Sequence, residues 1–407
     1  MRFSFALSVL TLTLSTSAMF AQGHKSADAR LPIPVDSSFF QSLGATPKHT
    51  KFNQMSADAN AATTQQPQRI VSVPNFTRSF VFGGQVFPFT MMGQDPSTGR
   101  TTTIPTNYVP MSLFFDQFVD SNGNNIVIDA TAITDEIKRS PNFENADYTS
   151  GETQFGDAVQ RAEFFSVINT EHHDRDDWHT LLSTPQTLIP VTIEVPAGSA
   201  VVFAAPDGSV GALIDINFIV SQLNTLIQTE ALNVDAVPIF LTRNAVYGDF
   251  KQGKPLNCCI GGFHTAFETK QVDNRHFVQL FDFATSLDSD IADRVFGDPT
   301  ALADVNALSH ELSETMNDPF VNNVVPNYQI PGAHAGVCQN VLETGDVIEN
   351  LPNDSFPVTL HGFTYHPQTE GLLEWFEGQS PSTAIDGAYS YPDTTKLTSP
   401  FTPCPTK

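Results

Sequence analysis

The residues best suited to chemistry lie in the stretch SHELSETMNDP, residues 309–319. His310 and Glu314 are four residues apart, so on a helix their side chains lie one turn apart and can bind the same ion. Glu311 follows the histidine directly, in the position of the general base in the H-E-x-x-H motif of metalloproteases. A glutamate replaces the second histidine of that motif, and zinc accepts carboxylate ligands. The stretch therefore predicts a metal site with Glu311 as catalytic base and zinc, or another divalent cation such as Mn²⁺ or Ca²⁺, as cofactor.

An ordinary amphipathic helix explains the same pattern without a metal. Val305, Leu308, Leu312 and Met316 share one helical face, and His310 lies on the opposite face. A polar face that is exposed to water needs no ligand. The spacing alone leaves both interpretations open.

The limits of the motif helix are marked by two prolines. Asp298 and Pro299 have the residue types of a helix N-cap and of the first helical position. Pro319 cannot continue a helix, and it disfavours helical geometry at Asp318. We therefore predict one helix that begins at Asp298 and ends just before Pro319.

The elements that must position this helix are strands and two further helices. Short runs rich in β-branched and aromatic residues, bounded by Gly, Pro and Asn, predict strands over 69–93, 101–119, 124–133, 236–250, 260–269 and 276–285. Apolar residues at helical spacing predict helices over 155–168 and 215–232. We therefore predict an α+β protein with a β-rich N-terminal domain over 69–195 and a second domain over 196–407 that contains the motif.

The N-terminus has the order of a secretory signal peptide. Arg2 is followed by an apolar run over 3–14 and by small residues over 15–21. Residues 22–68 are rich in Ala, Ser, Gln, Thr and Pro, which is typical of a flexible leader. No later run reaches the roughly 18 apolar residues of a membrane-spanning helix. We predict that residues 1–21 are removed and that the protein is secreted, either extracellular or periplasmic, without a membrane span.

The balance of charges limits the class of partner. The chain has 20 basic and 44 acidic residues, which gives a net charge of −24. Such a surface repels the phosphate backbone, so nucleic acid is excluded as a partner. An acidic surface suits cations and also keeps an exported protein soluble.

The four cysteines predict two disulfides. They are Cys258, Cys259, Cys338 and Cys404, and export favours their oxidation. A bridge between neighbouring residues has unfavourable geometry. We therefore predict that Cys258 or Cys259 pairs with Cys338 or Cys404.

Four stretches of the C-terminal half resemble motifs of one family. GGFHTAF (261–267), SHELSETMNDPFVN (309–322), LETGDV (342–347) and LLEWFEG (372–378) stand in the order of motifs in the plant phosphate-induced, EXORDIUM-like family of secreted proteins and its bacterial relatives. The resemblance covers about residues 200–400. The order of a sheet, a long helix, further strands and then the motif helix is also similar to that of zincin-like metallopeptidases.

The resemblance implies a zincin-like domain and adds ligands from outside the helix. Glutamate-type zincins complete their site with a downstream carboxylate, which here implies Glu343 or Asp346. His264, on a strand before the helix, is a further metal-ligand candidate, although a hydrogen-bonded sheet histidine is an equal alternative. The predicted function is metal-dependent hydrolysis of a peptide or related amide. The alternative is a non-catalytic extracellular protein that binds a cell-wall polymer or a partner and uses the ion or the polar cluster structurally.

Overall fold

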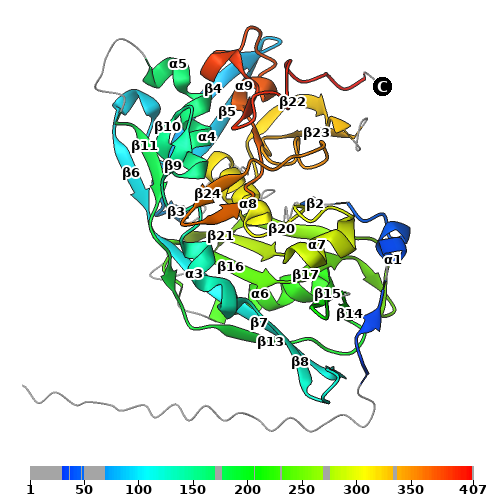
Figure 1. Cartoon of the computed structure of the whole chain (residues 1–407). Helices are drawn as coiled ribbons and strands as arrows, with labels where there is room; N and C mark the ends of the chain where they lie inside the picture. Colours follow the sequence, from blue (N-terminus) through cyan, green and yellow to red (C-terminus); the bar gives the residue numbers. More distant parts are fainter. Residues whose placement is uncertain are drawn as a thin grey trace, which may run out of the picture.

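A computed structural model describes residues 30–35, 37–46, 48–49, 69–169, 177–205, 207–229, 232–268, 276–332 and 337–405. The chain folds as a mixed α+β protein around a curled sheet, which occupies the lower part of Figure 1. Among the described residues, no helix has both the length and the apolar character needed to cross a membrane. The α+β class predicted from the sequence is confirmed.

The central strands of the sheet follow the order β14-β15-β17-β20-β21-β16-β7. Their bounds are Ala200–Ala204 (β14), Val210–Asp215 (β15), Ala245–Gly248 (β17), Ile260–Glu268 (β20), His276–Ser286 (β21), Val237–Arg243 (β16) and Thr106–Val119 (β7). β15 with β17, β21 with β16, and β16 with β7 are parallel pairs, whereas β14–β15 and β20–β21 are antiparallel. β20 and β21 therefore form a hairpin-like pair inside a mixed sheet.

Strands from both halves of the sequence share this sheet. β7 pairs with β16, so Thr106 lies opposite Val237. The remaining strands of the same sheet are β1 (Ile33–Pro34), β2 (Lys48–His49), β3 (Arg69–Val71), β8 (Asn125–Asp129), β12 (Gln186–Thr187) and β13 (Val191–Glu194). The ranges 69–195 and 196–407 thus contribute jointly to one sheet.

Side chains alternate between the two faces of the sheet, as strand geometry requires. On β16, Ile239 and Leu241 join a core cluster on one face, and Phe240 joins a cluster on the other. Helix α6 (Ile216–Thr229) covers the Phe240 face, and the opposite face packs against α7 (Ser289–Phe296) and α8 (Asn306–Asn317). Both faces are apolar, and the polar residues on β20 and β21 that face α8 stand out against them.

Helix α8 carries the HELSE motif and starts later than we predicted. It begins at Asn306 instead of Asp298, and it ends at Asn317, before Pro319, as predicted. The side chain of Asp298 instead accepts the backbone N–H of Thr300 in a turn. Leu302 has a φ of 54°, which is incompatible with a helix that runs on from Asp298.

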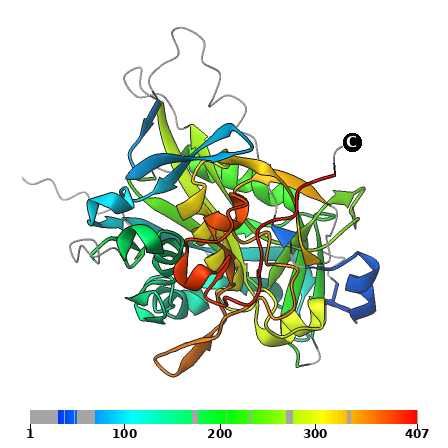
Figure 2. The ribbon, with the colours of Figure 1, turned by 90° about the horizontal axis from the view of Figure 1, so that it is seen from above.

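A second layer covers the side of α8 that faces away from the sheet (Figure 1). It contains the hairpin β4 (Asn75–Phe82) and β5 (Gln85–Met92) and the helices α4 (Phe155–Glu163) and α5 (Phe165–Ile168). The C-terminal residues add β22 (Val324–Gln329), β23 (Cys338–Val341), β24 (Val358–Leu360), β25 (Phe363–Tyr365), β26 (Glu370–Gly371), α9 (Leu373–Phe376) and β27 (Ser390–Tyr391). Seen from above, the red residues lie over the middle of the molecule, whereas the orange hairpin β24–β25 projects from its edge (Figure 2).

Short elements connect these layers. They are η1 (Pro96–Thr98), β6 (Thr101–Ile104), η2 (Ala130–Ile133), α3 (Thr134–Lys138), β9 (Ala146–Tyr148), β10 (Gly151–Thr153), β11 (His179–Leu182), β18 (Phe250–Lys251), β19 (Lys254–Pro255) and η5 (Ile385–Gly387). Part of the leader predicted to be flexible also packs on the core. Its helix α1 (Ser37–Ser42) buries Phe40, whose ring meets that of Phe203 edge-on at 4.9 Å.

The disulfide pairing that we predicted is wrong. Cys258 is bonded to its neighbour Cys259, and Cys338 is bonded to Cys404. The peptide bond between the neighbouring cysteines is cis, and their Cα atoms are 3.0 Å apart. Both belong to the core cluster under α7 and α8, whereas Cys338 lies on β23 in the second layer. The two pairs therefore lie in different layers.

Candidate metal centre

Strand β20 presents His264 toward helix α8. His264 has the same strand parity as Ala266, which belongs to the core cluster that contains α7 and α8. The next residue, Thr265, points to the other face of the sheet, as does Phe263. Opposite His264 on β21 stands Asp282, whose side chain accepts a hydrogen bond from Thr315 of α8 at 2.6 Å. The strand pair thus contributes polar groups where the helix crosses it.

Glu314 lies between the two histidines. Its Oε2 atom is 3.2 Å from His310 Nε2 and 3.4 Å from His264 Nδ1. Glu311 reaches the same place from the neighbouring turn of α8, because its Oε2 atom is also 3.4 Å from His264 Nδ1. Three side chains predicted from the motif and one from the strand therefore form a single cluster.

The loop after β23 closes the cluster. Glu343 Oε2 lies 3.9 Å from His264 Nε2, and Asp346 Oδ1 lies 3.9 Å from His310 Nε2. The second carboxylate oxygen of Glu314, Oε1, accepts the backbone N–H groups of Gly345 at 3.0 Å and of Asp346 at 3.3 Å. The structure thus brings together all six residues named from the sequence.

The cluster is buried. The exposed fractions are 0% for His310 and Glu311, 1% for Glu343, 2% for Glu314, 4% for His264 and 6% for Asp346. Every residue of α8 is buried, so the alternative of a polar helix face in water is wrong. Glu311 is also buried, because its side chain faces the sheet, where its Oε2 atom lies 3.4 Å from His264 Nδ1.

Two glycines allow this close packing. A Cβ atom on Gly262 of β20 would lie 2.6 Å from Glu311 Oε1 and 2.7 Å from the carbonyl oxygen of Phe283. A Cβ atom on Gly345 would collide with the ring of His310. The backbone therefore approaches Glu311 and His310 more closely than any other residue type would allow.

The charged groups of the cluster shift one another's pKa values. Burial opposes protonation of His264, but the carboxylates of Glu311 and Glu314 outweigh it and raise the pKa of this histidine well above its usual value. The same balance, with Glu314 as the strongest carboxylate, raises the pKa of His310. Burial alone would raise the pKa of Glu314, but the two histidines lower it well below its usual value. A cation would interact favourably with the same group of carboxylates.

The donor atoms fit a divalent cation. Two groups that share Glu314 have their donor atoms within 4.8 Å of one another, one with His264 and Glu343 and the other with His310 and Glu311. Donors bound tetrahedrally to zinc at 2.0–2.2 Å are about 3.3–3.6 Å apart. The Glu314–His310 and Glu314–His264 separations, 3.2 and 3.4 Å, are close to this range. The buried His and Glu groups could therefore hold a metal ion.

Comparisons with known proteins add no assignment. No family model, no curated protein and no solved structure matches this chain. The chemistry of the site therefore has to be argued from its geometry.

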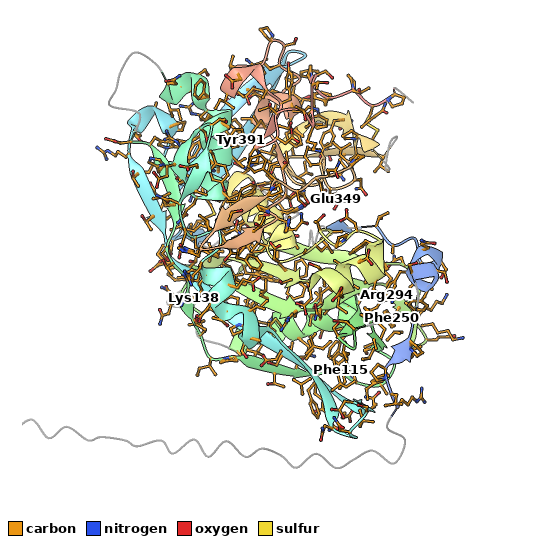
Figure 3. All side chains as sticks on the ribbon, in the orientation of Figure 1. Phe115, Lys138, Phe250, Arg294, Glu349 and Tyr391 are labelled. Carbon is orange, nitrogen blue, oxygen red and sulfur yellow. A yellow bond between two sulfur atoms is a disulfide. The ribbon has the colours of Figure 1, made fainter. Side chains whose placement is uncertain are left out.

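Three buried carboxyl groups near the cluster were missed in the sequence. Burial, together with nearby carboxylates such as Glu314, raises the pKa of Glu370 well above its usual value, although His310 opposes it. Burial also raises the pKa of Asp282 to about 7 and that of Glu349 well above its usual value. Glu349, labelled in Figure 3, follows Ile348 of the second layer. Of the three, Asp282 had a sequence signal, because it is the one acidic residue of the strand 276–286.

Three other histidines that the structure describes pair with carboxylates outside the cluster. His179 pairs with Asp157 at 2.7 Å, and His366 pairs with Asp304 at 2.7 Å. His361 contacts Glu144 from the β24–β25 hairpin. His172 and His173, in the acidic and histidine-rich stretch 171–179, lie outside the described residues.

Proposed function

We propose that this protein is a metal-dependent hydrolase that acts on peptide or related amide bonds, with zinc as the first candidate for the ion. Glu314 would hold the ion either together with His264 and Glu343 or together with His310, because these are the donor atoms that lie within 4.8 Å of one another. The observation that carries the proposal is the position of Glu314 Oε2, 3.2 Å from one histidine and 3.4 Å from the other. Glu311, adjacent in sequence to the ligand His310, is the proposed base.

The roles follow from the properties of each side chain. When bound, the ion supplies Lewis-acid polarisation of the scissile carbonyl. Glu311 accepts a proton from the attacking water and passes it to the leaving amine. Asp318 orients His264, because its backbone carbonyl oxygen lies 3.2 Å from His264 Nε2. A ligand whose ring is held in this way keeps a defined orientation toward the ion.

The proposal includes a fold and a location. We assign a zincin-like arrangement to the range 196–407, supported by the packing of the motif helix on the β20–β21 pair. We also propose that residues 1–21 are removed on secretion, and N-terminal sequencing of the exported protein tests this. The EXORDIUM-like resemblance of the four motifs supports an extracellular role.

The burial of the donors favours a second candidate function. Structural zinc sites are closed, whereas catalytic sites keep one open position. All six residues of the cluster are at most 6% exposed. In this alternative the ion stabilises a non-catalytic extracellular protein that binds a cell-wall polymer or a partner.

Glu311→Gln separates the two functions. Glutamine has the same shape but cannot accept the proton, so the zinc-loaded variant should keep its metal and lose hydrolysis by about 100-fold or more. The assay uses fluorescein-labelled, denatured casein, and zinc content is measured in parallel. If the wild-type protein cleaves casein and the variant cleaves it equally well, Glu311 is not the base. If neither protein cleaves casein while both hold zinc, the ion is structural.

A further inference from the structure

Residues 30–35, 37–46 and 48–49 form an N-terminal segment that runs along the rim of the sheet. β1 pairs with β14, so Ile33 lies opposite Phe203. The next element, α1, inserts Phe40 into the core cluster, where this side chain is fully buried. Its neighbours Phe39 and Leu43 pack against the same cluster. The segment is thus anchored by apolar contacts before it reaches β20.

The segment then adds a strand, β2, to β20. The carbonyl oxygen of Thr46 accepts the backbone N–H of Cys259 at 3.1 Å, and β2 continues parallel to β20. Gly262 is paired with Ala284 of β21 and also with His49 of β2. Because a strand residue has only two edges, β2 must lie on the edge of β20 opposite β21. Figure 1 shows β2 beside β20 and close to α8.

This edge runs beside the metal cluster. Gly262 pairs with His49 of β2. A Cβ atom on Gly262 would lie 2.6 Å from Glu311 Oε1. His264, a proposed ligand, is two residues further along the same strand. A chain that lies on this edge therefore passes next to both the proposed base and the proposed metal.

The edge of a strand binds an extended peptide through backbone hydrogen bonds, largely irrespective of its sequence. A peptide hydrolase needs its substrate extended beside the base and the metal. We propose that β2 occupies the edge of β20 on which an extended peptide substrate lies, so that β2, anchored through α1, blocks the site until it is displaced. This inference rests on the proposed hydrolase function.

The test uses the zinc-loaded full chain with Lys48→Pro and the matched control Lys48→Ala. Proline removes one backbone N–H of β2, whereas alanine shortens the same side chain and keeps that N–H. One probe is fluorescein-labelled, denatured casein. The other is a labelled synthetic peptide of residues 40–49, whose binding is followed by fluorescence anisotropy. β2 has two residues, so both variants should melt at similar temperatures; if Lys48→Pro does not fold, His49→Pro and His49→Ala replace the pair.

We expect Lys48→Pro to bind the peptide and to cleave casein about tenfold better than Lys48→Ala. The reason is that β2 leaves the edge of β20 free in a larger fraction of the molecules. Equal binding and equal cleavage by the two variants would overturn the inference. If all forms cleave casein equally, the hydrolase function stands and the blocking role of β2 fails. If only Lys48→Pro binds the peptide and no form cleaves casein, the conclusion that β2 occupies a peptide-binding edge is kept, and the hydrolase function is rejected.

Discussion

At the scale of single residues, the two carboxylate oxygens of Glu314 contact different groups. Oε2 faces His310 and His264, where an ion would bind. Oε1 accepts the N–H groups of Gly345 and Asp346 and so fixes the loop that supplies Asp346. One side chain therefore connects the helix, the strand and the loop. Its replacement should affect metal binding and local stability together.

Gly345→Ala tests how closely the loop approaches His310. The added Cβ atom would collide with the buried ring, so the ring or the loop must move. We expect zinc affinity to fall by about 10-fold or more, as it does when groups that orient a ligand are lost. The control is Gly261→Ala, whose Cβ atom would crowd the flexible end of Leu302 at 2.8 Å instead. Zinc titrations that give equal affinities for the two variants would contradict this account.

At the scale of elements, the local patterns predicted most of the architecture around the site. The helix predicted over 155–168 appears as α4 and α5, with a break at Phe164, and the helix over 215–232 appears as α6. The strands over 260–269 and 276–285 correspond to β20 and β21. The strand over 236–250 splits at Asn244, which has a φ of 49°. Periodicity found these elements because each has an apolar side that packs on the core.

Features of the site that depend on tertiary contacts could not be predicted from the periodicity of the sequence. The burial of the polar side of α8 depends on a second layer built from both ends of the chain. Glu370 belongs to no recognisable motif. It acts on His310 because the second layer brings β26 close to α8. The pairing of Cys258 with Cys259 was likewise not predicted from the spacing of the four cysteines. Local patterns therefore predicted the candidate ligands but not the groups that enclose them.

The Cys338–Cys404 bridge ties β23 to the C-terminal residues, across a sequence separation of 66. Closing a loop of this length stabilises a protein by about 4 kcal/mol in the entropic model. We expect the double variant Cys338→Ser/Cys404→Ser to lose roughly 2–5 kcal/mol in urea denaturation. Peptide mapping without reduction should recover a cross-linked 338–404 pair. A peptide that links Cys258 or Cys259 to either of these residues would contradict the observed pairing.

At the scale of the whole molecule, an acidic chain has buried several of its carboxyl groups. Glu163 and Glu374 lie in the second layer, away from the cluster of histidines, and burial raises the pKa of each well above its usual value. Burial also raises the pKa of the half-buried Glu377 to about 7. These groups hold a proton in the folded protein at a pH where the unfolded chain has lost it.

Stability should therefore depend on pH with a known sign. The folded state binds more protons than the unfolded state above the usual glutamate pKa of 4.5, so the free energy of unfolding falls as pH rises through about 7, the folded pKa of Glu377. Glu163→Gln removes one such group, and its free energy of unfolding should change less between pH 5 and pH 8. Glu194→Gln, on the surface, is the control. If the Glu163 variant keeps the slope of the wild-type protein, this carboxyl group is not protonated in the fold.

The central claim is that the buried cluster around Glu314 binds one divalent cation. The most direct measurement is the zinc content of the folded protein by elemental analysis, after incubation with zinc and removal of the excess, in the wild type, Glu314→Gln and the control Glu194→Gln. We expect about one zinc ion per chain in the wild type and the control. We expect almost none in Glu314→Gln, which should also melt at the same temperature with and without a chelator. A wild-type protein without zinc, or a Glu314 variant with as much zinc as the wild type, would contradict it.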